Sequence, residues 1–194
     1  MFKTTFRYIV LLTALGLVGN AQAEDYVIDT KGMHATIQFK INHLGFSWLI
    51  GRFNKFDGDF TYDAKNPNNN KVNVNIDVTS VDSNHAERDK HLRSADFFDV
   101  AQHPTATFTS TGYVSKGKNA GVLKGKLTLR GVTKDISIKV KHIAGGKDPW
   151  GGFRRGFSGK TTLKLSDYKM AKAAVLGPAA EKVELSLHIE GIRK

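Results

Sequence analysis

One segment, residues 183–190, reads Val-Glu-Leu-Ser-Leu-His-Ile-Glu and places an apolar side chain at every second position. The same alternation recurs at residues 36–41, 72–79 and 135–141. A period of two gives each strand one dry face and one face in water. Because no long amphipathic helix is expected to cover so many strands, they must close on one another. The pattern therefore predicts an all-β fold whose sheet closes into a barrel.

Turn residues separate the alternating runs and set the expected strand bounds. The predicted strands are 26–28, 35–41, 51–53, 56–62, 72–79, 106–111, 122–129, 135–141, 157–165 and 183–189. A closed sheet of this size can enclose a cavity for one apolar ligand. The alternation alone does not distinguish a hollow lumen from one that side chains fill.

One region, at about residues 84–100, breaks the strand pattern. Asn84 and Glu87 have the spacing of a reciprocal helix cap. We therefore predict a short helical crossover, or cap, over one end of the barrel. Phe97 and Phe98 would turn into that open end, either as a gate or as ordinary capping contacts.

The N-terminal residues have the pattern of a secretory signal peptide. Lys3 and Arg7 precede a short apolar stretch, and small residues at 21–23 provide a cleavage site. The alternative, an N-terminal membrane anchor, requires a longer apolar stretch. We predict a signal peptide at residues 1–23 and a single domain at 24–194.

The chain of 194 residues contains no cysteine. It is therefore expected to fold outside the cytoplasm without disulfides, and to depend on its core and on sheet closure. A cleaved signal peptide and the absence of cysteine together favour the bacterial periplasm.

The formal net charge of the chain is +11, and many lysines occupy outward strand positions. One interpretation is a solvated face whose lysines discourage edge pairing. The sharper interpretation is transient contact with an anionic membrane surface. Nucleic acid is not an expected partner, because the longest notable basic run is only Arg154-Arg155 and no nucleic-acid motif is present. A homodimer stays open, since strand edges and outer lysines do not decide it.

Several motifs follow one another along the chain, at residues 26–29, 34–39, 42–45, 51–53, 56–58, 89–98, 103–104, 107–110, 125–134, 148–152 and 166–170. Together they resemble the YceI family of polyisoprenoid-binding, lipocalin-like proteins. The run at 89–98, Asp-Lys-His-Leu-Arg-Ser-Ala-Asp-Phe-Phe, is the most specific of them. The resemblance implies an eight-stranded antiparallel barrel with an apolar tunnel for an isoprenoid chain. One departure is Ser166, where many members of the family have an arginine before the aspartate.

Inward apolar and aromatic residues are the candidates for lining such a tunnel. They are Phe39, Ile41, Trp48, Phe53, Phe60, Ile76, Phe97, Phe98, Phe108, Leu127, Ile138, Phe157 and Leu163. For each residue alone, ordinary core packing is the competing interpretation. Trp48 has two further possibilities: a place at the mouth, touching ligand or membrane, or burial at a bulged strand corner.

Catalytic, metal and cofactor sites are not expected. Asp89 and His91 are two apart, so they face different ways on a helix and make a poor acid-base pair. The seven histidines form neither an HxH nor an HExxH arrangement.

Three function classes remain at this point. The first is a periplasmic carrier that sequesters a polyisoprenoid-type lipid, a prenol or a quinone, in the barrel. The second is a stress-induced stabiliser or interaction protein whose barrel is filled and binds no ligand. The third, an enzyme acting on an apolar substrate, has the weakest support in the residues.

Overall fold

The structure, a computed structural model, describes residues 23–170 and 177–194. The predicted signal peptide therefore lies outside the described residues, apart from Ala23. The strands are β1 (Glu24–Ile28), β2 (Thr36–His43), β3 (Ser47–Phe53), β4 (Phe56–Tyr62), β5 (Lys71–Asp77), β6 (Val81–Asp82), β7 (Thr105–Ser115), β8 (Ala120–Leu129), β9 (Val132–Lys147), β10 (Phe153–Lys164) and β11 (Lys182–Arg193). The helices are α1 (Ala86–Arg93) and the 3-10 turns η1 (Pro67–Asn69), η2 (Val78–Ser80), η3 (Leu165–Tyr168) and η5 (Pro178–Glu181).

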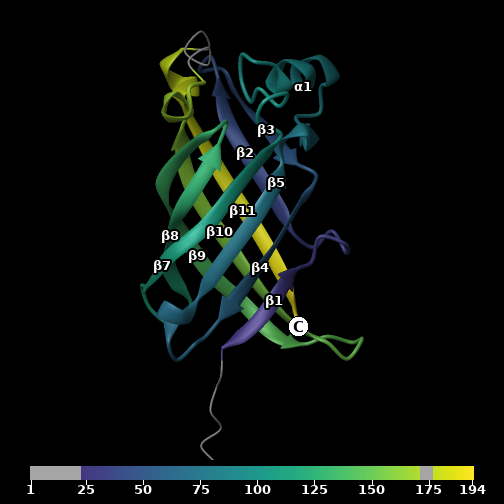
Figure 1. Ribbon diagram of the computed structural model, residues 1–194, viewed down its shortest axis with the longest axis vertical. Helices are drawn as coiled ribbons and strands as arrows, with labels where there is room; N and C mark the ends of the chain where they lie inside the picture. The colour runs from purple at the N-terminus through teal and green to yellow at the C-terminus, as the bar shows by residue number, and fades with distance from the viewer. Residues whose placement is uncertain (1–22, 171–176) are drawn as a thin grey trace, which may run out of the picture.

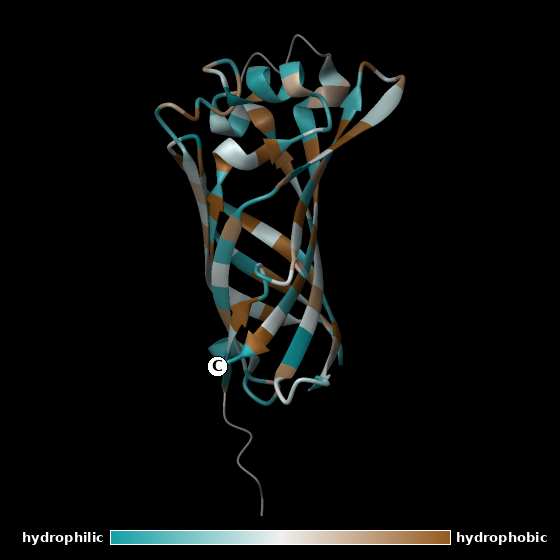
Figure 2. Ribbon diagram, turned by 90° about the vertical axis from the view of Figure 1, so that its right-hand side faces the viewer, coloured by the Kyte–Doolittle hydropathy of each residue, from teal (hydrophilic) through white to brown (hydrophobic). Residues whose placement is uncertain are grey.

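The sheet closes into a barrel because its first strand pairs with its last. The strands are hydrogen-bonded in the order β1-β4-β5-β7-β8-β9-β10-β11, and β11 returns to β1 through an antiparallel register that includes Val27 opposite Ile192. Hydrophobic and hydrophilic residues alternate along the strands, as Figure 2 shows. The predicted all-β, eight-stranded antiparallel, lipocalin-like barrel is confirmed.

Three of the barrel strands are interrupted part of the way along the wall. Strand β11 pairs with β2 through residues 183–188 and with β1 through residues 191–193, so β1 and β2 act as two halves of one strand. In the same way, β3 and β4 are two halves of one strand, and β5 and β6 are two halves of the strand beside it. The breaks fall at residues 29–35, 54–55 and 78–80.

The break between β5 and β6 corrects one predicted strand. The run expected to continue through Thr79 ends at Asp77, where η2 begins. The Asp77 carboxylate accepts a hydrogen bond from the backbone N–H of Thr79 at 2.9 Å, which caps the 3-10 turn. A short aspartate side chain often favours such a turn over an extended strand.

The two ends of the barrel differ. The helix end carries α1, whereas the C-terminal end carries the chain terminus and β1 (Figure 1). The predicted crossover is present at the helix end, as α1 followed by hydrogen-bonded turns up to residue 103. Among the described residues, no helix has the length and apolar character that crossing a membrane requires.

The cap of α1 is not the expected pair of Asn84 and Glu87. The helix begins one residue later, and His85 is its N-cap, accepting from the backbone N–H of Arg88 through Nδ1 at 3.2 Å. Asn84 instead takes a left-handed conformation with φ 61°. Asparagine tolerates that conformation better than most residues, so it suits the turn into the helix.

Buried polar contacts tie α1 to the barrel. The Asp89 carboxylate accepts the backbone N–H of Ser83 at 2.8 Å, and it also accepts the Ser83 hydroxyl. Arg88 donates to the Ser83 hydroxyl at 2.8 Å and to the Ser83 carbonyl at 2.5 Å. Because Asp89 and Ser83 are both buried, breaking this cluster would leave polar groups without partners.

Candidate ligand-binding cavity

The lumen of the barrel contains two adjoining cavities. The one at the helix end, the helix chamber, has a volume of about 280 Å³. The other, the C-terminal chamber, has a volume of about 150 Å³. Both are lined by Ile37, Ile76, Leu127 and Leu185, which places the chambers end to end along the lumen. An apolar protein cavity of about 150 Å³ stays dry and can accept a guest the size of benzene.

The polar groups in the two chambers are of different kinds. In the helix chamber, the polar lining residues among the described ones are His43, Arg88 and His91, and the others are apolar. In the C-terminal chamber, no charged residue belongs to the described lining. The lumen therefore favours an elongated apolar guest, and its basic groups lie at the helix end alone.

Interior glycines help to keep the lumen open. A Cβ on Gly51 would lie 2.2 Å from the Phe39 ring, and one on Gly125 would lie 2.4 Å from the Phe108 ring. These aromatic rings lie against the wall in the space that a side chain would take. A ring lying against the wall fills less of the axis than one projecting into the lumen, so rows of phenylalanine are compatible with a cavity.

Twelve of the thirteen tunnel candidates line the chambers. Phe39, Ile41, Phe53, Phe97, Phe98 and Leu163 line the helix chamber. Phe60, Phe108, Ile138 and Phe157 line the C-terminal chamber, and Ile76 and Leu127 line both. Whether these side chains contact a ligand remains a prediction.

Trp48 is the exception, and it corrects the sequence analysis. It is 52% exposed, so the proposed buried strand corner is wrong. It lies outside both chambers, while its neighbour Leu49 lines the helix chamber. The ammonium group of Lys40 lies 4.1 Å from the centre of its ring. Trp48 therefore belongs to the outer face of the hairpin between β2 and β3.

Two tyrosines in the C-terminal chamber were missed. Tyr62 is in phase with Phe60, so extending the alternation by one step would have found it. Tyr113 is out of phase with Phe108 because the register of β7 shifts between Ser110 and Gly112. A bulge of this kind moves later side chains to the other face, and the sequence carries no clear signal for it.

A partly buried charged network lies at the C-terminal end. Arg155 donates to Glu24 Oε2 and to the Tyr26 hydroxyl, each at 3.0 Å, and its guanidinium lies 4.1 Å from the centre of the Tyr62 ring. Arg155 also lies 3.3 Å from His142 Nε2. Burial, followed by the charge of Arg155, lowers the pKa of His142. A neutral imidazole can accept this hydrogen bond, so the network has matched donors and acceptors.

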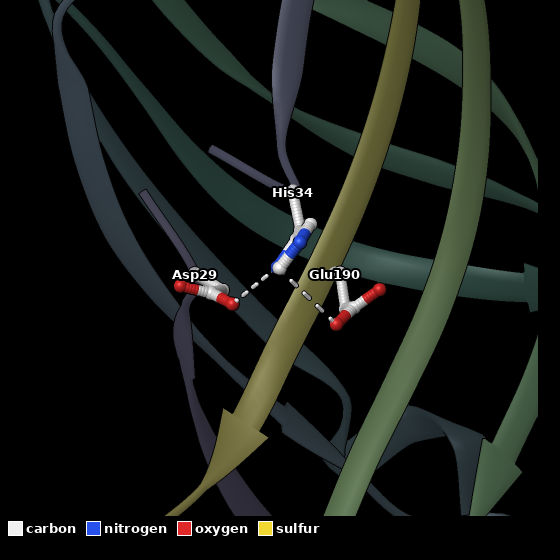
Figure 3. Close-up of side chains that lie close together, drawn as sticks. All are labelled: Asp29, His34 and Glu190. Atoms are coloured by element: carbon white, nitrogen blue, oxygen red, sulfur yellow. Dashed lines mark hydrogen bonds and ion pairs between the residues drawn. The ribbon is translucent and has the colours of Figure 1, made fainter. Parts of the chain in front are cut away.

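A second charged cluster lies near that end and includes Asp29, His34 and Glu190 (Figure 3). Their ligand atoms lie within 4.8 Å of one another, as a metal site would require. However, Arg154 Nη1 is 2.6 Å from a carboxylate oxygen of both Asp29 and Glu190. The guanidinium therefore supplies the positive charge in this cluster.

The pKa of Asp29 reflects that arrangement. Burial alone would raise it, but hydrogen bonds from His34, from Arg154 and from the backbone N–H of Gly32 outweigh burial and lower it to about 2. The carboxylate thus stays ionised, and Arg154, which also contacts Asp148 Oδ2 at 2.9 Å, links three acids.

The fold and the dry lumen define a hollow, lipocalin-like barrel. The sequence matches the YceI-like domain over residues 26–191. A UPF0312 protein of Pseudomonas aeruginosa is 55% identical over 194 residues, which cover all of both chains. This chain therefore belongs to the YceI family.

Solved structures agree with that assignment. The YCEI protein of Campylobacter jejuni is 30% identical, with a TM-score of 0.71 over 80% of this chain and 91% of that one. A protein of Saccharophagus degradans, described as a polyisoprenoid binding domain, is 16% identical and has a TM-score of 0.63. The comparison covers 87% of this chain and 98% of the Saccharophagus chain, and at that identity it supports the fold alone.

Proposed function

We propose that this protein binds a polyisoprenoid-type lipid, a prenol or a quinone, in its two chambers and carries it through the periplasm. The observation that carries the proposal is an elongated lumen with an almost wholly apolar lining. A structural neighbour from Saccharophagus degradans, which shares the fold, is itself described as a polyisoprenoid binding domain. Burying an isoprenoid tail contributes roughly 25 cal/mol for each Å² removed from water, before ordering costs.

The polar groups suggest how such a ligand would be oriented. Its polar head would lie at the helix end, where the Arg88 N–H groups that Ser83 does not accept can donate hydrogen bonds to a carbonyl, hydroxyl or phosphate oxygen. His91 lines the same chamber, and its Nε2 pairs with Asp96 Oδ2 at 3.1 Å. Its tail would extend into the uncharged C-terminal chamber. The Arg155 network stands at that end, so the proposed route in and out is at the helix end.

Binding of this kind requires no catalytic group, and we propose a non-enzymatic protein. The proposed periplasmic location depends on the signal-peptide pattern at residues 1–23 and on the absence of cysteine. A homodimer has no role in the proposal. One premise of the stabiliser hypothesis, a lumen filled by side chains, does not hold, since both chambers are present.

The test is to fill the helix chamber. Ala106 is buried and lines that chamber, so Ala106→Phe places a ring where the ligand would lie. Ala120→Phe, at an exposed position, is the matched control. In native mass spectrometry of protein purified from its own host, we expect an apolar ligand of several hundred daltons on the wild type and on Ala120→Phe. Occupancy of Ala106→Phe should be at least tenfold lower.

Two results would contradict the proposal. One is wild-type protein that stays free of ligand after incubation with a detergent-solubilised prenol and quinone. The other is an Ala106→Phe variant that is folded by circular dichroism and is loaded as fully as the wild type.

A further inference from the structure

We propose that the β2–β3 hairpin docks the protein on an anionic lipid bilayer, so that the helix chamber exchanges its ligand directly with the membrane. This inference depends on the proposed function, because it concerns how the same cavity is loaded. It adds a docking surface and a partner, which the apolar lumen by itself does not specify.

The first observation is a concentration of exposed apolar side chains. The described residues include nine exposed large hydrophobic side chains, and four of them lie within seven positions of this hairpin. These four are Leu44, Phe46, Trp48 and Ile50. Phe46, at the turn, is 87% exposed. A contiguous patch of this kind on a protein surface indicates a partner that is itself apolar.

The hairpin turn holds Phe46 outward. The Asn42 side chain accepts a hydrogen bond from the backbone N–H of Gly45 at 2.6 Å, and the Phe46 N–H donates to the His43 carbonyl at 2.9 Å. Leu44 has φ 54° and Gly45 has φ 84°, so both are left-handed. This turn geometry directs a bulky apolar residue into solvent, where it contributes nothing to the core.

The opposite face of the same hairpin belongs to the cavity. His43 and Leu49 line the helix chamber together with Arg88, His91 and Leu92 from α1. Alternate residues of β3 therefore face the chamber and the exterior. If the exterior face contacts a bilayer, a lipid chain can pass into the chamber beside Leu49 with little exposure to water.

Charge favours a bilayer with anionic lipids over other apolar partners. The segment Thr36–Phe53 carries two cations, Lys40 and Arg52, and one histidine, and it contains no carboxylate. The net charge of the whole chain is +11. Tryptophan with a nearby lysine is typical of side chains at the membrane interface. Both cations have an acidic partner: Lys40 is paired with Glu184 at 3.1 Å, and Arg52 with Asp82 at 3.5 Å. Apolar insertion is therefore expected to supply most of the attraction, with a smaller electrostatic part.

A second exposed hairpin, between β9 and β10, provides a matched control. It carries Ile143 and Trp150, which are 59% and 77% exposed. It differs in three respects: Asp148 lies in the loop, Arg154 stands over the Trp150 ring, and Arg155 forms a charged network at the adjacent end of the barrel. Trp150→Ser removes as large a ring as Phe46→Ser without affecting the proposed docking surface.

The experiment is flotation of the full protein with vesicles of phosphatidylethanolamine, with and without phosphatidylglycerol. We expect the wild type and Trp150→Ser to float with the phosphatidylglycerol vesicles. Phe46→Ser should bind them at least tenfold more weakly. In a Trp150→Phe background, the fluorescence of Trp48 should shift to the blue on the same vesicles, because its ring enters a less polar medium.

The controls separate this inference from the proposed function. Phe46→Ser should still bind a detergent-solubilised quinone as tightly as the wild type, because Phe46 lines neither chamber. If the wild type binds quinone in detergent but never floats, or if Trp150→Ser loses flotation as fully as Phe46→Ser, the docking surface is wrong and the carrier proposal stands. If no lipid binds in detergent, the carrier proposal itself fails. Capture of a soluble protein by the hairpin, without flotation, would also overturn the inference.

Discussion

The two ends of this barrel are built from the same strands but handle polarity in opposite ways. At the C-terminal end, Arg155 makes hydrogen bonds to Glu24 and Tyr26 and lies over Tyr62. At the helix end, Arg88 contacts the chain through Ser83, and the neighbouring hairpin exposes Phe46 to water. One end carries a partly buried charged network, and the other carries an exposed apolar hairpin beside a cavity.

The comparison shows how a barrel acquires a direction. The strand alternation makes the lumen apolar along its whole length and gives no reason for the two ends to differ. The difference comes from the few inward polar residues. At the C-terminal end Arg155 pairs with the Glu24 carboxylate, whereas at the helix end Arg88 donates to the hydroxyl and the carbonyl of Ser83. Opening the C-terminal end would therefore break an ion pair in a partly buried site, and opening the helix end would break hydrogen bonds to a neutral residue.

The largest expected effect on stability is at the C-terminal end. Arg155→Met should lower the free energy of unfolding by about 2–3 kcal/mol, because it removes the donor to the Tyr26 hydroxyl and one of the three donors to the partly buried Glu24 carboxylate. Arg155 is 13% exposed and Glu24 is 29% exposed, so solvent would relieve part of the loss. Urea unfolding followed by circular dichroism measures the change.

The matched change at the helix end is Arg88→Met, which loses two hydrogen bonds to Ser83 and should cost about 1 kcal/mol. A cost for Arg88→Met equal to that for Arg155→Met would remove the asymmetry between the two ends.

The next largest effect is the pH dependence of stability that comes from the cluster of Asp29, His34 and Glu190 near the C-terminal end. The pKa of Asp29 is lowered from 3.8 to about 2 on folding, so its contribution is fully present above pH 4 and is lost as the pH falls from about 4 to about 2. The difference between the folded and unfolded pKa values corresponds to a loss of about 2 kcal/mol in the free energy of unfolding. Urea unfolding across this pH range measures it.

The control is Asp29→Asn, which should be less stable at pH 7 and should show a shallower decline between pH 4 and pH 2. Glu24 and Asp148 also have lowered pKa values, so some decline should persist in the variant. Parallel curves for the wild type and Asp29→Asn would show that this carboxylate is not held by its partners.

The smallest expected effect concerns the helix end. In Gly51→Ala, the new methyl group would lie 2.2 Å from the Phe39 ring, which must leave the wall and enter the helix chamber. We expect a loss of about 1 kcal/mol in stability and weaker binding of a detergent-solubilised quinone. Thermal unfolding and a ligand titration measure the two changes.

Gly146→Ala is the neutral comparison, because no described residue has an atom within 4 Å of the position its Cβ would take. If Gly51→Ala were as neutral as Gly146→Ala in both measurements, the position of the Phe39 ring would not determine the size of the helix chamber.

Much of the architecture could be predicted from residue patterns. Strand β4 has its predicted bounds, Phe56–Tyr62, and the predicted crossover lies where α1 is found. The misses have local causes. Asp77 ends a strand through its own side chain, and the irregularity between Ser110 and Gly112 turns Tyr113 inward. Trp48 is a tunnel candidate in the sequence because it is apolar, although its neighbour Leu49 has the inward phase.

The charged network was beyond the reach of the sequence. Arg155 and Glu24 are 131 positions apart, and they meet only because β1 and β10 both pair with β11. In the sequence Arg154-Arg155 is an isolated basic pair, whereas in the fold its two side chains join two different clusters. Adjacent residues on a strand face opposite sides, which separates them.

The sequence by itself determined the barrel and its apolar lumen, because a period of two is a local property of the chain and fixes which face of each strand avoids water. Only the tertiary structure decided that the lumen is hollow, that a charged network lies at one end, and that the β2–β3 hairpin presents its apolar face beside the helix chamber. These features depend on which side chains meet across strands, and on aromatic rings lying against distant glycines. Such contacts arise only when the sheet has closed.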